Sequence, residues 1–231
     1  MSDKLTAIIL YTDVVKGSKT KQCRSVCNIT KKTTVIEQQI RLLKKNHSHI
    51  EIFIVAGKGY KEAYKIVKGL KFKNIEIVYE KKYTQLNQSQ ILIDLINNKK
   101  IHNNIIVILG EILLKNTNFK KLSHTTALII DKPKEGFDIR CRENDSKAEY
   151  FFYDIPNEKQ WAEIVFLDKE SLHTITNNMP KRMSTKQLFM FETLNLLIDQ
   201  DQKINTQIVE YKNILKIKGD KDINKAKVFI R

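Results

Sequence analysis

Basic side chains are the most abundant groups in this sequence that could do chemistry. The 231 residues contain 41 Lys and Arg against 26 Asp and Glu, which gives a net charge of +15 with neutral histidines. Ammonium and guanidinium groups bind phosphate oxygens, so this balance points to a nucleic acid, a nucleotide or a phosphorylated substrate. The basic residues are spread along the whole chain, however, which is more typical of a solvated lysine surface.

Cysteine and histidine spacing argues against a zinc centre. Cys23 and Cys27 lie four positions apart without an adjacent histidine, and the five histidines show no ligand spacing. Cys141 makes the cysteine count odd, too few for a disulfide framework. We interpret the aromatic residues 150–153 and Trp161 as core or as the wall of a site, rather than as a platform for stacking bases.

Short apolar runs separated by helical periodicity predict the framework that must position these groups. Continuous, β-branched runs are typical of buried parallel strands, and they occur at residues 5–11, 50–55, 75–79 and 105–109. Helices are predicted between them, at residues 36–43, 60–70 and 89–97. Thr34 is the expected N-cap of the first helix, with Glu37 completing a capping box.

This alternation predicts an α/β fold with a mostly parallel central sheet flanked by helices on both faces. In such sheets, functional groups gather on the loops at the carboxyl ends of the strands. Those loops are residues 11–22, 56–59, 80–88 and 110–115.

The second half of the chain predicts a more mixed set of elements. Strands are expected at residues 126–131, 148–153, 163–167 and 214–218, and helices at 186–199 and 223–230. No Pro/Gly/Ser-rich linker and no internal repeat divides the chain, so we expect one domain over residues 1–231.

The hydropathy pattern predicts no membrane partner. There is no run of 18 apolar residues, and the first residues lack the apolar stretch of a signal peptide. We therefore expect a cytoplasmic protein. The bias toward Lys, Asn and Ile fits an AT-rich bacterium or a phage-infected host, with the virion as an alternative location.

The order of elements, with residues at particular spacings, resembles the sugar-phosphate nucleotidyltransferases, including their phosphocholine cytidylyltransferase-like members. That family opens with a strand, a Gly-rich loop, a Pro-Lys pair and a helix start of the form Gly-Lys-Thr-x-Leu-Glu. Residues 7–10 are similar to the strand, and residues 23–26 fall where the Pro-Lys pair is expected. Residues 29–37 match the helix start, with Lys32 and Glu37 in place.

The resemblance continues along nearly the whole chain. Residues 52–57 are similar to the second strand, and residues 79–92 to the nucleotide-site loop. Gly110-Glu111 resembles the metal-binding Gly-Asp turn, and residues 217–226 resemble the late Ile-Asp…Asp-Leu-x-x-Ala motif.

The resemblance implies a glycosyltransferase-A-like fold, a Mg²⁺ cofactor, and a nucleoside triphosphate and a phosphorylated small molecule as substrates. The implied site residues are Arg24 and Lys32 for catalysis, Tyr11, Thr12, Asp13, Asn87 and Ser89 for nucleotide binding, and Glu111 for metal binding, with Asp220 or Asp222 as the candidate for the second metal carboxylate. The expected reaction is in-line attack of an acceptor phosphate oxygen on the α-phosphorus, with release of pyrophosphate.

Several positions depart from the family pattern. Asp13 and Val15 stand where the loop glycines are expected, Glu111 replaces the metal Asp, and Lys218 falls at the second metal Asp. Glycines in such a loop let backbone N–H groups approach phosphates closely. The alternative is therefore a catalytically degenerate nucleotidyltransferase fold that serves as a binding or structural module, with protein partners in a larger, phage-type assembly. A nucleic-acid-associated protein is disfavoured because no recognition motif is present.

Overall fold

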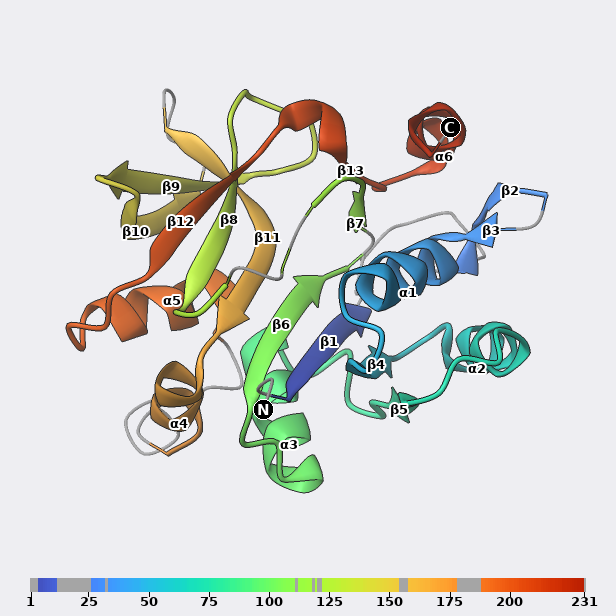
Figure 1. Cartoon of the computed structure of the whole chain (residues 1–231), viewed down its shortest axis with the longest axis horizontal. Helices are drawn as coiled ribbons and strands as arrows, with labels where there is room; N and C mark the ends of the chain where they lie inside the picture. The colour runs from blue at the N-terminus through green and yellow to red at the C-terminus, as the bar shows by residue number, and fades with distance from the viewer. Residues whose placement is uncertain are drawn as a thin grey trace.

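The computed structural model describes residues 4–11, 26–31, 33–110, 112–117, 119, 122–153, 158–177 and 188–230. Within these residues the main sheet has nine strands in the order β5-β4-β1-β6-β11-β8-β12-β10-β9. The fold class expected from the sequence is confirmed: one end of the sheet is parallel, and the other end is mixed (Figure 1).

The parallel end of the sheet comes from the first half of the chain, as predicted. Its strands are β1 (Leu5–Tyr11), β4 (Glu51–Ala56), β5 (Ile75–Tyr79) and β6 (Asn104–Leu109). The helices between them are α1 (Val35–Asn46), α2 (Tyr60–Gly69) and α3 (Gln88–Lys99). β1 pairs in parallel with both β4 and β6 and is buried along most of its length, which accounts for its continuous apolar sequence.

Alternate side chains of β1 enter two different cores. Ile8 and Leu10 pack with buried residues of α3, whereas Ala7 and Ile9 pack with buried residues of α1. The crossover helices therefore cover opposite faces of the sheet, as the strand–helix alternation predicted.

The N-cap of α1 is confirmed, because the Oγ1 atom of Thr34 accepts a hydrogen bond from the backbone N–H of Glu37 at 3.3 Å. The capping box expected from Glu37 is replaced by a different contact. Its carboxylate accepts from the guanidinium of Arg41, one turn along, at 2.7 Å.

The second half of the chain adds strands of mixed direction. They are β8 (Thr126–Ile130), β9 (Ile139–Asn144), β10 (Lys147–Tyr153), β11 (Lys159–Leu167) and β12 (Asn205–Val209). β11 joins the two halves, since it runs antiparallel to both β6 and β8. The sequence did not predict β9 or β12, and it placed the start of β11 four residues late.

Two helices pack on the α3 side of this half, α4 (Lys169–Asn177) and α5 (Met190–Ile198). α4 was not predicted. The predicted start of α5 at Lys186 lies outside the described residues, and Leu188 and Phe189 are not helical. Phe189 has an extended backbone, and its N–H donates to the carboxylate of Glu192 at 2.7 Å, which begins the helix at Met190.

A short ribbon brings the end of the chain back to the middle of the fold. β7 (Ile112–Leu114) pairs antiparallel with β13 (Ile214–Lys216), and α6 (Asp220–Phe229) follows. α6 packs against the hairpin of β2 (Asn28–Thr30) and β3 (Thr33–Thr34) around a small core of its own (Figure 1). The predicted strand over 214–218 therefore ends at Lys216, and the last helix starts three residues before the predicted Ile223.

No helix among the described residues is long and apolar enough to cross a membrane.

In the mixed end of the sheet, the carboxylate of Glu143 links three strands, and its contribution to the free energy of unfolding should depend on pH. Glu143 on β9 accepts from Lys159 on β11 at 2.7 Å and from Thr206 on β12 at 2.8 Å. Burial raises the pKa of Glu143, but these two partners outweigh burial and hold the pKa below the ordinary value of 4.5. A lowered folded-state pKa means that the stabilisation is present above pH 4.5 and is lost as the pH falls through the folded pKa.

We expect Glu143→Gln to lower the free energy of unfolding by about 1 kcal/mol at pH 7. The difference from the wild type should shrink as the pH falls below the pKa of Glu143. Urea unfolding at several pH values measures it, with Glu149→Gln on the exposed face of β10 as control. A deficit that persists unchanged at pH 3 would contradict the assignment.

Candidate active site

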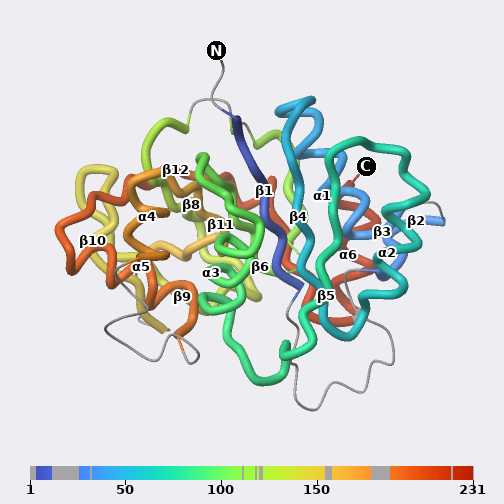
Figure 2. The backbone as a smooth tube through the Cα atoms, turned by 90° about the horizontal axis from the view of Figure 1, so that it is seen from below, coloured from blue at the N-terminus to red at the C-terminus, as the bar shows by residue number. Residues whose placement is uncertain are grey.

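The carboxyl ends of β1, β4 and β6 lie at one edge of the sheet, where the sequence predicted the functional loops. Figure 2 shows β1 running down from the N-terminus toward this edge, with the segment between β5 and α3 lying along it. Of the predicted nucleotide-binding residues, Tyr11, Asn87 and Ser89 are described here, whereas Thr12 and Asp13 lie outside the described residues.

Tyr11 belongs to a buried network that fixes the turn after β6. Its hydroxyl donates to the Oε1 atom of Gln39, on α1. The Nε2 atom of Gln39 donates to the carbonyl oxygens of Gly110 at 3.1 Å and Ile112 at 2.8 Å. Gly110 has φ +72°, a conformation that glycine adopts without strain. Gln39, which sequence reasoning missed, thus holds both neighbours of Glu111.

Asn87 and Ser89 begin α3 in different environments. Asn87 occupies the N-cap position with an extended backbone, but its side chain makes no capping hydrogen bond. Ser89 is buried, and its hydroxyl lies 2.5 Å from that of Thr193 on α5. That contact joins two helices. A role for either residue in nucleotide binding stays a prediction.

Gly57 lets the segment after β5 approach the end of β4. A Cβ atom on Gly57 would lie 2.3 Å from the Cγ atom of Tyr83, far below a normal contact. The turn over residues 57–59 was predicted, and the close approach of an aromatic ring explains why its first position has no side chain.

A cavity of about 190 Å³ opens at the same edge, beside Leu109 and Gln88. Its walls carry the aromatic side chains Tyr153, Trp161, Phe189 and Phe191. The rings of Tyr153 and Phe191 meet edge to face at 5.1 Å, and those of Phe189 and Phe191 stack at 6.1 Å. Trp161 was interpreted as core or wall, and it is both, being buried while lining the cavity.

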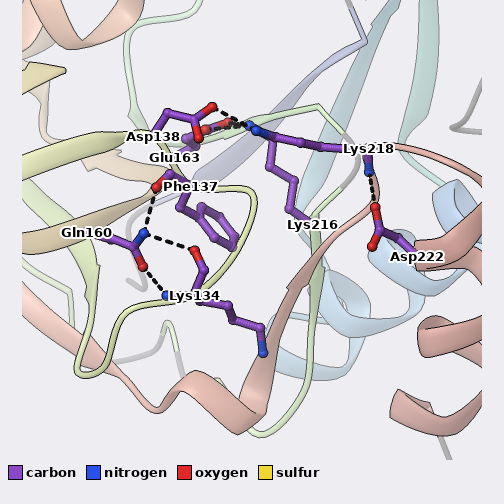
Figure 3. A network of polar contacts seen from close by, with 8 residues as sticks. All are labelled: Lys134, Phe137, Asp138, Gln160, Glu163, Lys216, Lys218 and Asp222. Carbon is purple, nitrogen blue, oxygen red and sulfur yellow. Dashed lines mark hydrogen bonds and ion pairs between the residues drawn. The ribbon is translucent and has the colours of Figure 1, made fainter. Parts of the chain in front are cut away.

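The carboxylates of Asp138 and Glu163 and the ammonium group of Lys216 form the charged side of this cavity, and Lys218 pairs with Asp138 (Figure 3). Glu163 accepts from the Nζ atom of Lys216 at 2.6 Å, and Asp138 accepts from that of Lys218 at 2.7 Å. Glu163 has φ +56° inside β11, where the pairing with β8 shifts register between Trp161 and Val165. Such a bulge re-aims a side chain, and a left-handed backbone at a bulky residue marks a constrained position.

Burial dominates the electrostatics of this cluster. It raises the pKa of Glu163, while the ammonium groups of Lys216 and Lys218 oppose that rise. Burial also raises the pKa of Tyr153, and the charges of Glu192 and Glu163 add to that shift.

Gln160 fixes the segment that presents Asp138. Its Nε2 atom donates to the carbonyl oxygens of Lys134 at 2.9 Å and Phe137 at 2.7 Å, and its Oε1 atom accepts from the backbone N–H of Lys134 (Figure 3). The loop between β8 and β9 is therefore attached to β11, the strand that carries Glu163.

The remaining predicted site residues are described only in part. Arg24, Lys32 and Glu111 lie outside the described residues, as does the side chain of Asp220. Asp222 is described. Its carboxylate accepts from the backbone N–H groups of Lys218 at 2.9 Å and Gly219 at 3.2 Å, which caps α6.

The described residues alone do not fit a magnesium ion. Among them no group of three or more His, Cys, Asp or Glu side chains gathers at one point. Asp138, Glu163 and Asp222 each have a lysine partner, and the partner of Asp222 is Lys225 at 3.3 Å. Mg²⁺ binding through Glu111 with Asp220 or Asp222 therefore stays a prediction.

Comparison with known proteins defines the fold. No protein-family model and no curated protein matches this sequence. Among solved structures, the CTP:phosphocholine cytidylyltransferase from Streptococcus pneumoniae aligns with a TM-score of 0.77 and 19% identity, over 99% of this chain and 100% of that one. The inositol-1-phosphate CTP transferase from T. maritima aligns with a TM-score of 0.76 and 13% identity, over 99% and 96%.

A nucleoside-diphosphate-sugar pyrophosphorylase from Vibrio cholerae RC9 gives a TM-score of 0.75 at 10% identity, over 97% of this chain and 99% of that one. This chain therefore has the fold of the sugar-phosphate nucleotidyltransferases, which confirms for the fold the resemblance expected from the sequence.

Proposed function

We propose that this protein transfers a nucleotidyl group from a nucleoside triphosphate to a small phosphorylated acceptor and releases pyrophosphate. The observation that carries the proposal is the cavity at the carboxyl edge of the sheet, where aromatic walls meet the cluster of Glu163, Asp138, Lys216 and Lys218. Ligand sites in α/β sheets lie at this edge. The same assignment is supported by the fold that this chain shares with two CTP-dependent transferases and a nucleoside-diphosphate-sugar pyrophosphorylase.

Nucleotidyl transfer requires mainly that the two substrates are correctly positioned and that the negative charge of the phosphates is neutralised. An oxygen of the acceptor phosphate attacks the α-phosphorus, the bond to the β-phosphate oxygen breaks, and pyrophosphate leaves with that electron pair. Arg24 and Lys32 are the proposed cations for the triphosphate. Tyr11, Thr12, Asp13, Asn87 and Ser89 complete the proposed nucleotide site, and Glu111 with Asp220 or Asp222 is the proposed metal site.

The acceptor should be small. A cavity of about 190 Å³ is below the usual range for a drug-sized ligand, so it suits the head of a sugar phosphate or of a phospho-alcohol. The proteins of similar structure are named for phosphocholine, inositol 1-phosphate and nucleoside-diphosphate sugars. A wall with aromatic faces and two carboxylates suits an acceptor with apolar or cationic parts.

Nucleotide binding tests the proposal. A ligand that binds only the folded protein, at 100 times its dissociation constant, should stabilise it by about 2.7 kcal/mol. We therefore expect the thermal midpoint to rise with at least one nucleoside triphosphate when each is measured with and without Mg²⁺. Pyrophosphate should then form when phosphocholine, inositol 1-phosphate or glucose 1-phosphate is added. The absence of a shift in thermal midpoint with every nucleoside triphosphate, dTTP included, would reject the activity.

A second candidate is a catalytically degenerate fold kept as a binding module. The observation that favours it is the lysine pairing of Asp138, Glu163 and Asp222, together with Lys218 at the sequence position where the family has an acid. For this candidate we expect nucleotide binding, or none, without pyrophosphate release under any of the conditions above.

A further inference from the structure

A second, larger cavity adjoins the aromatic pocket, since Lys216 lines both. It measures about 410 Å³ and is bounded by the β8–β9 loop, β13 and α6. Six lysines line it against two carboxylates, Glu135 and Asp222, so its lining carries a net charge of +4. The lysines are Lys115, Lys134, Lys212, Lys216, Lys218 and Lys225. We refer to this cavity as the basic groove.

Four of these six ammonium groups have carboxylate partners. Lys216 pairs with Glu163, Lys218 with Asp138, Lys212 with Glu210, and Lys225 with Glu135 and Asp222. Lys115 and Lys134 differ, because neither forms an ion pair with a described carboxylate. The positive charge in the groove that no described carboxylate neutralises therefore lies on Lys115 and Lys134.

Lys115 and Lys134 are held in place by neutral contacts. The Nζ atom of Lys115 donates to the carbonyl oxygen of Phe229 at 2.9 Å and lies 4.8 Å from the centre of that ring. The Nζ atom of Lys134 donates to the carbonyl oxygen of Tyr211 and lies 5.6 Å from its ring centre. An ammonium group has three donors, so each lysine retains two N–H groups for a ligand.

The backbone of Lys134 is fixed by hydrogen bonds, and its ammonium group lies near other positive charges. Gln160 bonds both the N–H and the carbonyl group of Lys134, and the side chain points away from that contact (Figure 3). Burial lowers the pKa of Lys134, and the charges of Lys225 and Lys115 lower it further against the opposing charge of Asp131. A bound anion would relieve this repulsion.

We propose that the basic groove binds a phosphate-bearing small molecule through Lys115 and Lys134, at a site that adjoins that of the proposed nucleotidyl transfer and shares Lys216 with it. Ammonium groups held at fixed positions suit phosphate oxygens, and Leu215 and Phe229 offer an apolar floor for the rest of the ligand. The inference does not depend on the transfer reaction.

Calorimetric titration with two probes tests the proposal and separates the sources of the phosphate group. Inorganic pyrophosphate represents a free anion, and phenyl phosphate an ester with an apolar part. The titrations are carried out without Mg²⁺ at about 0.15 M salt, where surface charges are screened beyond roughly 8 Å. Tighter binding of phenyl phosphate assigns an ester, and tighter binding of pyrophosphate assigns a free anion; either supports the groove.

The variant K115M/K134M should weaken binding of the better probe about 30-fold or more, as expected for the loss of two charged hydrogen-bond donors. The matched control K61M/K65M removes two exposed lysines from α2 and should change affinity less than about 3-fold. An unchanged thermal midpoint confirms that both variants fold.

Three results would overturn the inference: no binding by the wild type, equal losses in both double variants, or a loss confined to Arg24→Ala. The last result would place the phosphate at the proposed transfer site. It would leave the proposed function standing while the groove assignment fails. If nucleotidyl transfer is absent while K115M/K134M still abolishes probe binding, the groove assignment stands and the proposed function fails.

Discussion

Replacing Lys216 by Met should lower the free energy of unfolding by about 3–5 kcal/mol, because the substitution leaves the buried carboxylate of Glu163 without its partner. The two side chains are 18% and 12% exposed, and the Nζ atom lies 2.6 Å from Oε2. Removing one member of a buried pair costs far more than the pair contributes, since the remaining charge is neither solvated nor neutralised. Chemical unfolding at pH 7, followed by circular dichroism, measures the loss.

The double variant Glu163→Gln/Lys216→Met should recover most of that stability, because no unpaired charge is left. The pH dependence has a definite sign. Burial already raises the pKa of Glu163, and the loss of Lys216 should raise it further, so the deficit of Lys216→Met should be largest at neutral pH and shrink as the carboxyl group protonates in acid. Lys132→Met, at an exposed position, is the control. A loss below about 1 kcal/mol at pH 7 would show that Lys218 or water already compensates Glu163.

The parallel half of the sheet could be predicted because its strands are buried on both faces. β1 reads as an unbroken apolar run, and β6 does so from its second residue, a pattern that few other structures produce. β9 and β12 were not predicted because they are only partly buried and therefore lack a continuous apolar sequence. Their sequences, IRCREN and NTQIV, carry polar residues on a partly exposed sheet, which weakens the strand pattern. β12 also pairs with the distant β8, which leaves no local signal, whereas β9 forms a hairpin with β10.

The candidate site was predictable only where the family resemblance or the strand ends marked it. Glu163 had a signal that was not used, because it is the one charged residue inside the apolar stretch 161–167, and buried acids in such strands need a partner. Gln39 had none, since a glutamine on an amphipathic helix is ordinary. Its role depends on the packing of α1 against the ends of β1 and β6, which the sequence does not reveal.

Replacing Gln39 by Leu should slow pyrophosphate release about 100-fold if the proposed reaction occurs. Gln39 is 3% exposed, and its amide holds the carbonyl groups on both sides of Glu111. Leu is close in size but makes none of these bonds, so Gly110 and Ile112 lose the donor that fixes their turn. A displacement of about 1 Å at a reacting group costs on the order of 100-fold in rate.

Stability should fall as well, by about 2–3 kcal/mol, because the carbonyl groups and the Tyr11 hydroxyl are left buried without this partner. Two further variants separate positioning from unfolding. Gln39→Glu keeps the acceptor for Tyr11 but cannot donate to the turn, and it should lose activity. Tyr11→Phe removes only the hydroxyl and should retain most of it.

Gln38→Leu is the matched control, since the same change falls one position earlier on a half-exposed part of α1. Glu111→Ala is the reference for complete loss, because it should abolish pyrophosphate release if this carboxylate binds the metal. Activity of Gln39→Leu and Gln39→Glu within about 3-fold of the Gln38→Leu value would mean that the turn holds its shape without Gln39. If Glu111→Ala also releases pyrophosphate at the wild-type rate, the carboxylate of Glu111 and the turn after β6 have no part in the reaction.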